Sequence, residues 1–209
     1  HTGRIDTRLL LESYYDYLKQ KGLLIADTFD YNHLDNKAEL KYKDFEARQI
    51  IFAEGFGMKK NPFFNKLPLQ GTKGELLVIR APDLKSEIIL KSSIFVIPII
   101  KDEYLVGSTY AWKDYSNEPT QNAKIQLLDK LKGLISCDFD IVQHRAGIRP
   151  TVPDRRPLVG QHGVYKSIYI LNGLGSRGVL IAPTVAKNLI DFIELGIPLD
   201  EEINIKRFQ

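Results

Sequence analysis

Two neighbouring stretches carry most of the information in this 209-residue chain: AGIRPTVPDRRPLVG (residues 146–160) and NGLGSRGVLIAP (residues 172–183). In the second stretch a glycine-dense turn opens onto an amphipathic run. Gly173, Gly175 and Gly178 lack a Cβ where the backbone must bend or approach another group closely. The N–H groups that follow are the first-turn donors of a helix, so the turn can face an electron-rich ligand. The alternative is a tight strand–helix turn without a ligand.

Composition and charge are those of an ordinary globular protein, with 44% hydrophobic and 26% charged residues. The net charge of +3 gives little support to nucleic-acid binding. The single cysteine, Cys137, excludes an internal disulfide and fits a reducing compartment, so we expect a cytoplasmic protein. No apolar run reaches the roughly 18 residues of a membrane span. The four histidines, His1, His33, His144 and His162, lack metal-ligand spacing, so we expect no metal site.

The apolar pattern predicts helices at both ends of the chain and a strand-rich middle. A first helix is expected from Asp6, its N-cap, to Gly22, its stop, and the last helix is expected to end at Gly196. A third helix is expected over 120–135. Strands are expected at 23–29, 38–42, 48–53, 74–81, 88–90, 93–100, 103–110, 141–149 and 168–171.

The order of these elements predicts a mixed fold. The strand at 48–53 is typical of a buried parallel strand, whereas the closely spaced middle strands indicate an antiparallel sheet with a turn at Lys101-Asp102. In the helix over 120–135, a common apolar face is predicted for Ile125, Leu128, Leu131 and Ile135. The two ends of the chain are expected to share one α/β layer, with the middle inserted between them.

Together, the two stretches resemble the C-terminal part of the D-amino-acid-oxidase-like, FAD-dependent oxidoreductases, the superfamily of glycine and sarcosine oxidases. The turn over 173–178 and the tail over 196–200 are similar to the oxidoreductase half of the bacterial tRNA wobble-uridine modification enzyme. The resemblance implies an α/β plus α+β fold: a partial FAD-binding α/β domain and an inserted, mostly antiparallel substrate domain. The implied divisions are 1–58 and 150–209 for the FAD-binding domain and 59–149 for the substrate domain.

The resemblance also implies a missing N-terminal region. The chain shows no Gly-x-Gly-x-x-Gly after a strand in its first half, so we expect this dinucleotide fingerprint upstream of residue 1. The chain is then a fragment of an FAD enzyme, and this piece alone is expected to bind FAD weakly or not at all.

The resemblance assigns the glycine turn to the cofactor. It sets the turn against the pyrimidine side of the flavin ring, although Leu174 stands where glycine oxidase-like proteins usually carry His. Gly55, which closes the strand over 48–53, is expected to let the chain approach the cofactor. The expected cofactor-binding residues are Gly173, Leu174, Gly175, Ser176, Arg177, Gly178, Val179 and Gly55.

Arg149 is the leading candidate for substrate binding. A guanidinium at the end of an apolar strand can form a bidentate pair with a carboxylate, and the resemblance implies that this carboxylate belongs to the substrate. An internal ion pair with Asp154 or a solvent-exposed charge is the alternative. Tyr110 is expected to line the same pocket. Phe95 stands where the resembled oxidases carry a tyrosine hydroxyl, and because Phe cannot donate a hydrogen bond, a small amino-acid substrate is put in doubt.

The implied activity is oxidation of a C–N bond in an amino acid or secondary amine, with FAD as cofactor and a small molecule as partner. No catalytic side chain is assigned, because the chemistry belongs to the cofactor. Two alternatives stay open: an FAD oxidoreductase that modifies the wobble uridine of tRNA, and a non-catalytic binding module.

Overall fold

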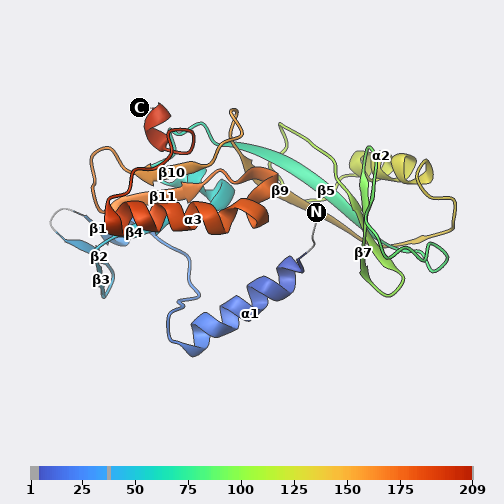
Figure 1. Cartoon of the computed structure of the whole chain (residues 1–209), viewed down its shortest axis with the longest axis horizontal. Helices are drawn as coiled ribbons and strands as arrows, with labels where there is room; N and C mark the ends of the chain where they lie inside the picture. Colours follow the sequence, from blue (N-terminus) through green and yellow to red (C-terminus); the bar gives the residue numbers. More distant parts are fainter. Residues whose placement is uncertain (1–4, 37–38, 209) are drawn as a thin grey trace.

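The computed structural model describes residues 5–36 and 39–208, and its elements form three β-sheets, two of which are covered by a helix (Figure 1). The expectations for His1 and for Ala38, the first residue of a predicted strand, lie outside the described residues.

One sheet joins the two ends of the chain. β4 (Ile50–Phe52) runs parallel to β11 (Ile168–Asn172), and β11 pairs antiparallel with β10 (Leu158–Gln161). The prediction of a parallel strand within 48–53 is therefore confirmed. Because β4 and β11 are far apart in sequence, residues from both ends share one layer, as expected.

α3 (Gly178–Leu195) lies along this sheet (Figure 1). Val185 and Leu189 of the helix pack with Val159 and Tyr169 of the sheet in one buried cluster. Gly196 follows the helix with φ 68°, the left-handed C-terminal conformation that its position predicts.

The strand-rich middle forms a five-stranded antiparallel sheet in the order β6-β7-β8-β5-β9. β7 and β8 make the expected hairpin, with Asp102 at φ 59° in its turn. The two longest strands, β5 and β9, pair along their whole length and extend toward the N-terminal end of α3 (Figure 1). The strands are β5 (Gln70–Arg80), β6 (Leu90–Lys91), β7 (Phe95–Ile100), β8 (Glu103–Gly107) and β9 (Asp140–Thr151).

α2 (Gln121–Lys132) covers the far part of this sheet, and the Thr120 hydroxyl caps it by accepting a hydrogen bond from Ala123 N at 3.2 Å. The expected face of the helix is wrong in part: Ala123, Leu127 and Leu131 are the buried residues, and Ile125 is 48% exposed. Ala123, Leu127 and Leu131 are spaced four residues apart, so they form one row on the helix, and this row faces the sheet. Ile125 lies on the other side and faces solvent.

The N-terminal region is less compact. α1 (Thr7–Gln20) begins at Asp6, whose carboxylate accepts hydrogen bonds from Arg8 N and Leu9 N, and none of its residues is buried. The helix stands apart from the sheets (Figure 1). The strand predicted over 23–29 is wrong, because the segment is an irregular connection with no neighbouring strand to pair with.

Short elements complete the fold. A three-stranded antiparallel sheet of β1 (Leu34–Asp35), β2 (Leu40–Tyr42) and β3 (Phe45–Ala47) packs through Leu40 on the core beneath β4. The 3-10 turns are η1 (Tyr31–His33), η2 (Gly55–Lys60), η3 (Gly175–Arg177) and η4 (Ile205–Phe208). Within residues 5–36 and 39–208, no helix combines the length and the apolar character needed to cross a bilayer.

The packing of α2 generates the first prediction. Leu127→Ala should lower the free energy of unfolding by about 2–5 kcal/mol, because it leaves a cavity beneath a fully buried position. Ile125→Ala, two residues away on the exposed side, is the matched control and should change it by less than about 0.5 kcal/mol. Urea denaturation of the two variants measures the difference, and equal losses would contradict the observed helix face.

Candidate functional site

A cavity of about 660 Å³ lies where β5, β9, the segment after β8 and the glycine turn meet. It contains Arg149 and Tyr110 together with five residues of the glycine turn, Gly173 to Arg177. Segments far apart in the sequence therefore share one site. The described residues that line the cavity are Gln70, Thr72, Tyr110, Trp112, Arg149, Thr151, Val152, Pro153, Arg155, Gly173, Leu174, Gly175, Ser176 and Arg177.

The pairing of β5 with β9 determines which side chains face the cavity. Thr72 lies opposite Arg149, and Gly74 lies opposite Gly147. Directly opposed residues share a face of the sheet, and alternate residues along each strand face the same way. The register thus brings Thr72 and Arg149 to one side, with two glycines beside them.

The Arg149 guanidinium occupies the space that Gly74 leaves open. A Cβ on Gly74 would come within 2.1 Å of both terminal nitrogens of the Arg149 guanidinium. The same guanidinium stands over the Tyr110 ring, 4.7 Å from its centroid, and Nη1 donates a long hydrogen bond of 3.4 Å to the carbonyl of Thr109. Stacking and one weak contact hold the group, and most of its donors remain for a ligand.

The alternative ion pair between Arg149 and Asp154 is wrong. Asp154 Oδ2 instead accepts a hydrogen bond from Arg207 Nε at 2.8 Å. Within residues 5–36 and 39–208, no carboxylate lies within ion-pair distance of Arg149.

The cavity is strongly basic. Arg149, Arg155 and Arg177 all line it, and none of the described lining residues is Asp or Glu. Arg156, the neighbour of Arg155 in sequence, is paired with Glu202 at 2.9 Å. The cations that face the cavity are thus left without acidic partners in the described part of the chain, which favours an anionic ligand.

The glycine turn has the backbone geometry that its composition predicts. Gly173 and Gly175 have φ 70° and 58°, values that side-chain-bearing residues rarely adopt. A Cβ on Gly173 would also come within 2.6 Å of Val152 Cγ2. Among the described residues, no side chain caps the N-terminus of η3 or α3, so the donors of this helix end are not used by a capping group.

Gly55 does not line the cavity but is joined to the turn. Its carbonyl accepts a hydrogen bond of 2.9 Å from Asn172 Nδ2, and Asn172 Oδ1 accepts one of 2.8 Å from Gly173 N. Asn172 is 3% exposed and connects the end of β4 with the start of the turn.

Phe95, Gly178 and Val179 are also outside the cavity lining. Phe95 shares the sheet face of Arg149, but β8 and β5 lie between their strands, and a Cβ on Gly107 of β8 would meet the Phe95 ring at 3.1 Å. Gly178 and Val179 begin α3, and Val179 is exposed.

Sequence reasoning missed several residues of the cavity, notably Trp112, Thr72 and Thr151. The two threonine hydroxyls lie 2.9 Å apart across the β5–β9 pair. Thr72 precedes the strand predicted over 74–81, and its alignment with Arg149 depends on the strand register. Trp112 carries a usable signal, since it is the one tryptophan of the chain and lies two residues after Tyr110.

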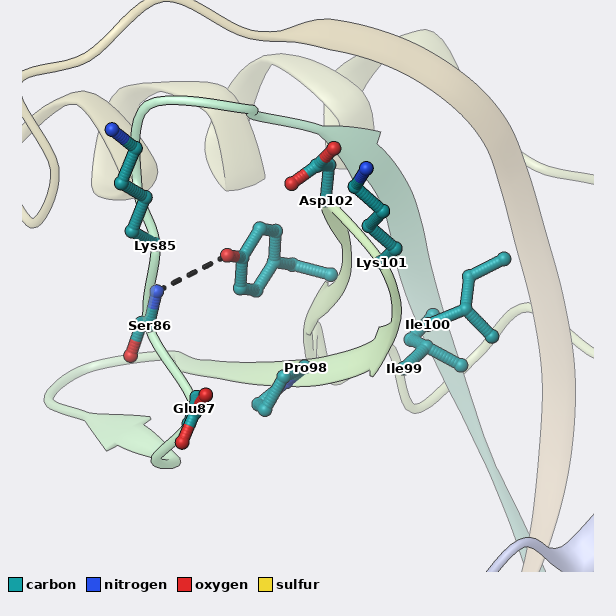
Figure 2. A pocket seen from close by; sticks show the side chains of 9 residues that line it. Lys85, Ser86, Glu87, Pro98, Ile99, Ile100, Lys101 and Asp102 are labelled. Atoms are coloured by element: carbon teal, nitrogen blue, oxygen red, sulfur yellow. Dashed lines mark hydrogen bonds between the residues drawn. The ribbon is translucent and has the colours of Figure 1, made fainter.

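A second hollow lies at the opposite end of the antiparallel sheet. Figure 2 shows Lys85, Ser86 and Glu87 on one side and the turn at Lys101-Asp102 on the other. Ser86 N donates a 3.2 Å hydrogen bond to the Tyr104 hydroxyl there. Its charges are mixed, and it holds none of the residues that the sequence predicted for a site. No group of three or more His, Cys, Asp or Glu residues suited to a metal occurs in the described part of the chain.

The family model described as DAO, FAD dependent oxidoreductase, matches residues 1–192. The chain therefore belongs to the DAO family of FAD dependent oxidoreductases, which confirms the resemblance seen in residues 146–183. Membership in this family supports an enzyme over a non-catalytic binding module.

Curated relatives agree with this assignment. The glycine oxidase of Pseudomonas aeruginosa is 26% identical over 161 residues, which are 75% of this chain and 44% of that protein. The tRNA 5-methylaminomethyl-2-thiouridine biosynthesis bifunctional protein of Idiomarina loihiensis is 28% identical over 130 residues, 59% of this chain and 21% of that protein. The chain spans about half or less of the length of the glycine oxidases it matches.

Solved structures confirm the fold class. The iminodiacetate oxidase of Chelativorans has a TM-score of 0.77 at 23% identity, with 96% of this chain and 58% of that chain covered. The glycine oxidase of Geobacillus kaustophilus has a TM-score of 0.66 at 19% identity, with 79% and 48% covered.

The pairing of Asp154 with Arg207 generates a prediction about stability. Asp154→Ala and Arg207→Ala should both lower the melting temperature, and Arg207→Ala should lower it more because Arg207 also donates to the carbonyls of Arg156 and Pro157. Arg149→Ala should leave it nearly unchanged. Burial raises the pKa of Asp154, but the hydrogen bond from Arg207 and the backbone N–H of Arg156 outweigh it, so the net pKa is lowered.

The sign of the pH dependence follows from this shift. A carboxyl with a lowered folded-state pKa stabilises the fold fully above its unfolded value of about 3.9 and loses that contribution as the pH falls through the folded value. Thermal melts between pH 7 and pH 2 should therefore show the penalty of Asp154→Ala shrinking at the acidic end. A pH-independent penalty would contradict the assignment.

Proposed function

We propose that the protein containing this chain oxidises the C–N bond of an amino acid or secondary amine, with FAD as cofactor and the 660 Å³ cavity as substrate site. Arg149 carries the proposal. Its guanidinium borders the cavity, has no carboxylate partner in the described residues, and lies over the Tyr110 ring in the space that Gly74 leaves open. A substrate carboxylate is the partner that this arrangement lacks.

The residues of the glycine turn fit one edge of the flavin. A Cβ on Gly175 would meet only Thr151 Cγ2, at 3.8 Å, within 4 Å, so a planar ring can approach the backbone there. The helix end at Gly178 has no side-chain cap in the described residues, and its N–H groups can stabilise negative charge on the ring. Gly173 to Val179 would hold this edge, and Gly55 would support the turn through Asn172.

When bound, the flavin supplies the two-electron oxidation that converts C–N into C=N. The chain's own contribution is orientation. Arg149 would form a bidentate pair with the carboxylate, which fixes the substrate at one end, and the Tyr110 ring beneath the guanidinium limits the motion of that pair. Thr72 and Thr151 line the same wall of the cavity, where their hydroxyls are hydrogen-bonded to each other and Thr151 also donates to the carbonyl of Gln70.

The substrate class follows from charge. Arg155 and Arg177 add two more cations to the wall, which favours a substrate with more than one anionic group, and so one larger than glycine. Phe95 lies outside the lining, so its missing hydroxyl does not bear on the substrate.

The second candidate is an FAD oxidoreductase that acts on a modified wobble uridine of tRNA. It is favoured by the sequence Gly-Leu-Gly-Ser-Arg-Gly over 173–178 and by the similarity to the tRNA 5-methylaminomethyl-2-thiouridine biosynthesis protein. The unpaired arginines would then meet phosphate groups. Flavin reduction by free amino acids, compared with reduction by wobble-modified tRNA, separates the two candidates.

Domain organisation and location are also proposals. We divide the chain into 1–58 and 150–209, as part of an FAD-binding domain, and 59–149, as a substrate domain. The five-stranded sheet, which lies between residues 70 and 151, and the sheet of β4, β10 and β11 support this division. A cytoplasmic location is supported by the single cysteine of the chain.

Gly175→Val tests the flavin site. In the full-length protein, purified with its N-terminal region, we expect a yellow wild type and a variant that retains much less FAD, because valine is strained at φ 58° and would project toward the ring. The flavin absorbance per protein measures the effect. A full-length wild type that stays colourless after incubation with FAD would overturn the cofactor assignment.

Substitutions at and around Arg149 test the substrate site. Arg149→Ala should raise KM about 30-fold or more with the flavin still bound, since losing a charge-assisted pair costs roughly 2–5 kcal/mol. Arg149→Lys should restore only part of the substrate affinity, because an ammonium group cannot form the two parallel hydrogen bonds that a planar guanidinium forms with a carboxylate. The measurement is steady-state flavin reduction by a panel of mono- and dicarboxylic amines.

Two glycines provide a matched pair for the same experiment. Gly74→Ala should raise KM, because its Cβ would displace the Arg149 guanidinium. Gly147→Ala, directly opposite on β9, should not, since no described atom lies within 4 Å of the added Cβ. Unchanged KM in both Arg149→Ala and Gly74→Ala would remove Arg149 from the substrate site.

A further inference from the structure

The segment between β8 and α2, residues 108–120, brings Tyr110 and Trp112 to the cavity. It contains no helix or regular strand, only an isolated bridge between Ala111 and Lys73 of β5. Such a long irregular segment needs specific anchors to keep two aromatic side chains at a binding site.

A buried lysine supplies the first anchor. Lys73 is 0% exposed, and its ammonium donates to Asp114 Oδ2 at 2.6 Å, to Ser116 Oγ at 3.0 Å and to the carbonyl of Glu118. Its backbone also exchanges two hydrogen bonds with Ala111, of 2.8 and 2.9 Å. All three donors of the ammonium are thus satisfied by residues 114–118.

Glu75, two residues further along β5, holds both ends of the same segment. Its carboxylate accepts hydrogen bonds from Thr120 N at 2.7 Å and from Thr120 Oγ1 at 2.9 Å. Its backbone N–H donates to Thr109 Oγ1 at 3.0 Å. His144 Nε2 lies 2.9 Å from the carboxylate, and Lys73 Nζ lies 3.7 Å from it. The buried charges of Lys73 and Glu75 therefore partly neutralise each other.

Strand alternation connects these anchors to the cavity. Lys73 and Glu75 point to one face of β5, and Thr72 and Gly74 point to the other, where Arg149 lies. The carbonyl of Thr109, which accepts the hydrogen bond from Arg149, belongs to the anchored segment. An unpaired buried ammonium is strongly unfavourable, so the segment cannot leave without a large cost.

We propose that Lys73 is a positioning residue of the substrate site: its buried ammonium fixes residues 108–120, so that Tyr110, Trp112 and the Thr109 carbonyl are held around the Arg149 guanidinium. The proposal rests on the proposed function in so far as the cavity is the substrate site. Lys73 does not contact the cavity itself and acts through the segment that it binds.

The experiment uses the full-length flavoprotein with two variants and a control. Lys73→Met keeps the volume of the buried side chain and removes its donors. Asp114→Asn, at a partly exposed position, removes the charged acceptor. Asp83→Asn is the matched control, because Asp83 is an exposed aspartate in the turn after β5 with no ion-pair partner among the described residues.

Amide hydrogen exchange gives a readout that needs no substrate. In Lys73→Met we expect the peptides that cover 108–120 to exchange at least about tenfold faster, with a smaller increase in Asp114→Asn and none in Asp83→Asn. Protection of 108–120 equal to that of the wild type would overturn the proposal.

Kinetics separate positioning from a general structural role. Lys73→Met and Asp114→Asn should raise KM for the amine at least fivefold, with kcat within about twofold and the flavin content unchanged, whereas Asp83→Asn should alter none of these. Loss of flavin together with kcat would assign Lys73 to overall stability and contradict the proposal. If no amine reduces the wild-type flavin, the proposed function fails, while the exchange experiment still decides whether Lys73 holds the segment.

Discussion

The antiparallel pairing of β5 with β9 is the constraint on which the rest of the site depends. The two strands pair from Gln70 opposite Thr151 to Arg80 opposite Asp140. A shift of one residue in this register would move Arg149 to the face that carries Lys73 and Glu75. In the observed register, Arg149 lies on the open face of the sheet, and the charged residues Lys73 and Glu75 lie on the buried face.

Two glycines leave space on the face of the sheet that carries Arg149. Gly74 leaves the space in which the Arg149 guanidinium lies, and Gly147 leaves the neighbouring surface of β9 free. At the end of β9, Val152 packs close to Gly173, so the same strand pair also determines how near the glycine turn comes to Arg149. In the function that we propose, this closeness would bring a substrate held by Arg149 next to the flavin.

The buried face uses charge differently. Lys73 is enclosed with Glu75, Asp114 and His144, whereas the arginines of the cavity have no acidic neighbours among the described residues. A buried charge with all its partners fixes local structure, and a charge without partners is available to a ligand. One strand, β5, thus separates a buried charge network from the face that lines the cavity, through the alternation of its side chains.

The sequence by itself indicated the family, through the resemblance of its two glycine-containing stretches. It also determined most helices and strands, because these depend on local periodicity, caps and backbone freedom. It also singled out Arg149 and the turn over 173–177, and the structure shows that both line one cavity. The false strand over 23–29 and the misassigned face of α2 are failures of local patterns, which do not reveal whether a partner strand or a sheet lies alongside. Only the tertiary structure decided that Thr72 and Trp112 join the cavity, that Asp154 binds Arg207 rather than Arg149, and that Lys73 is buried. These features depend on strand register and on contacts between residues tens of positions apart, which side-chain chemistry and spacing along the chain do not encode.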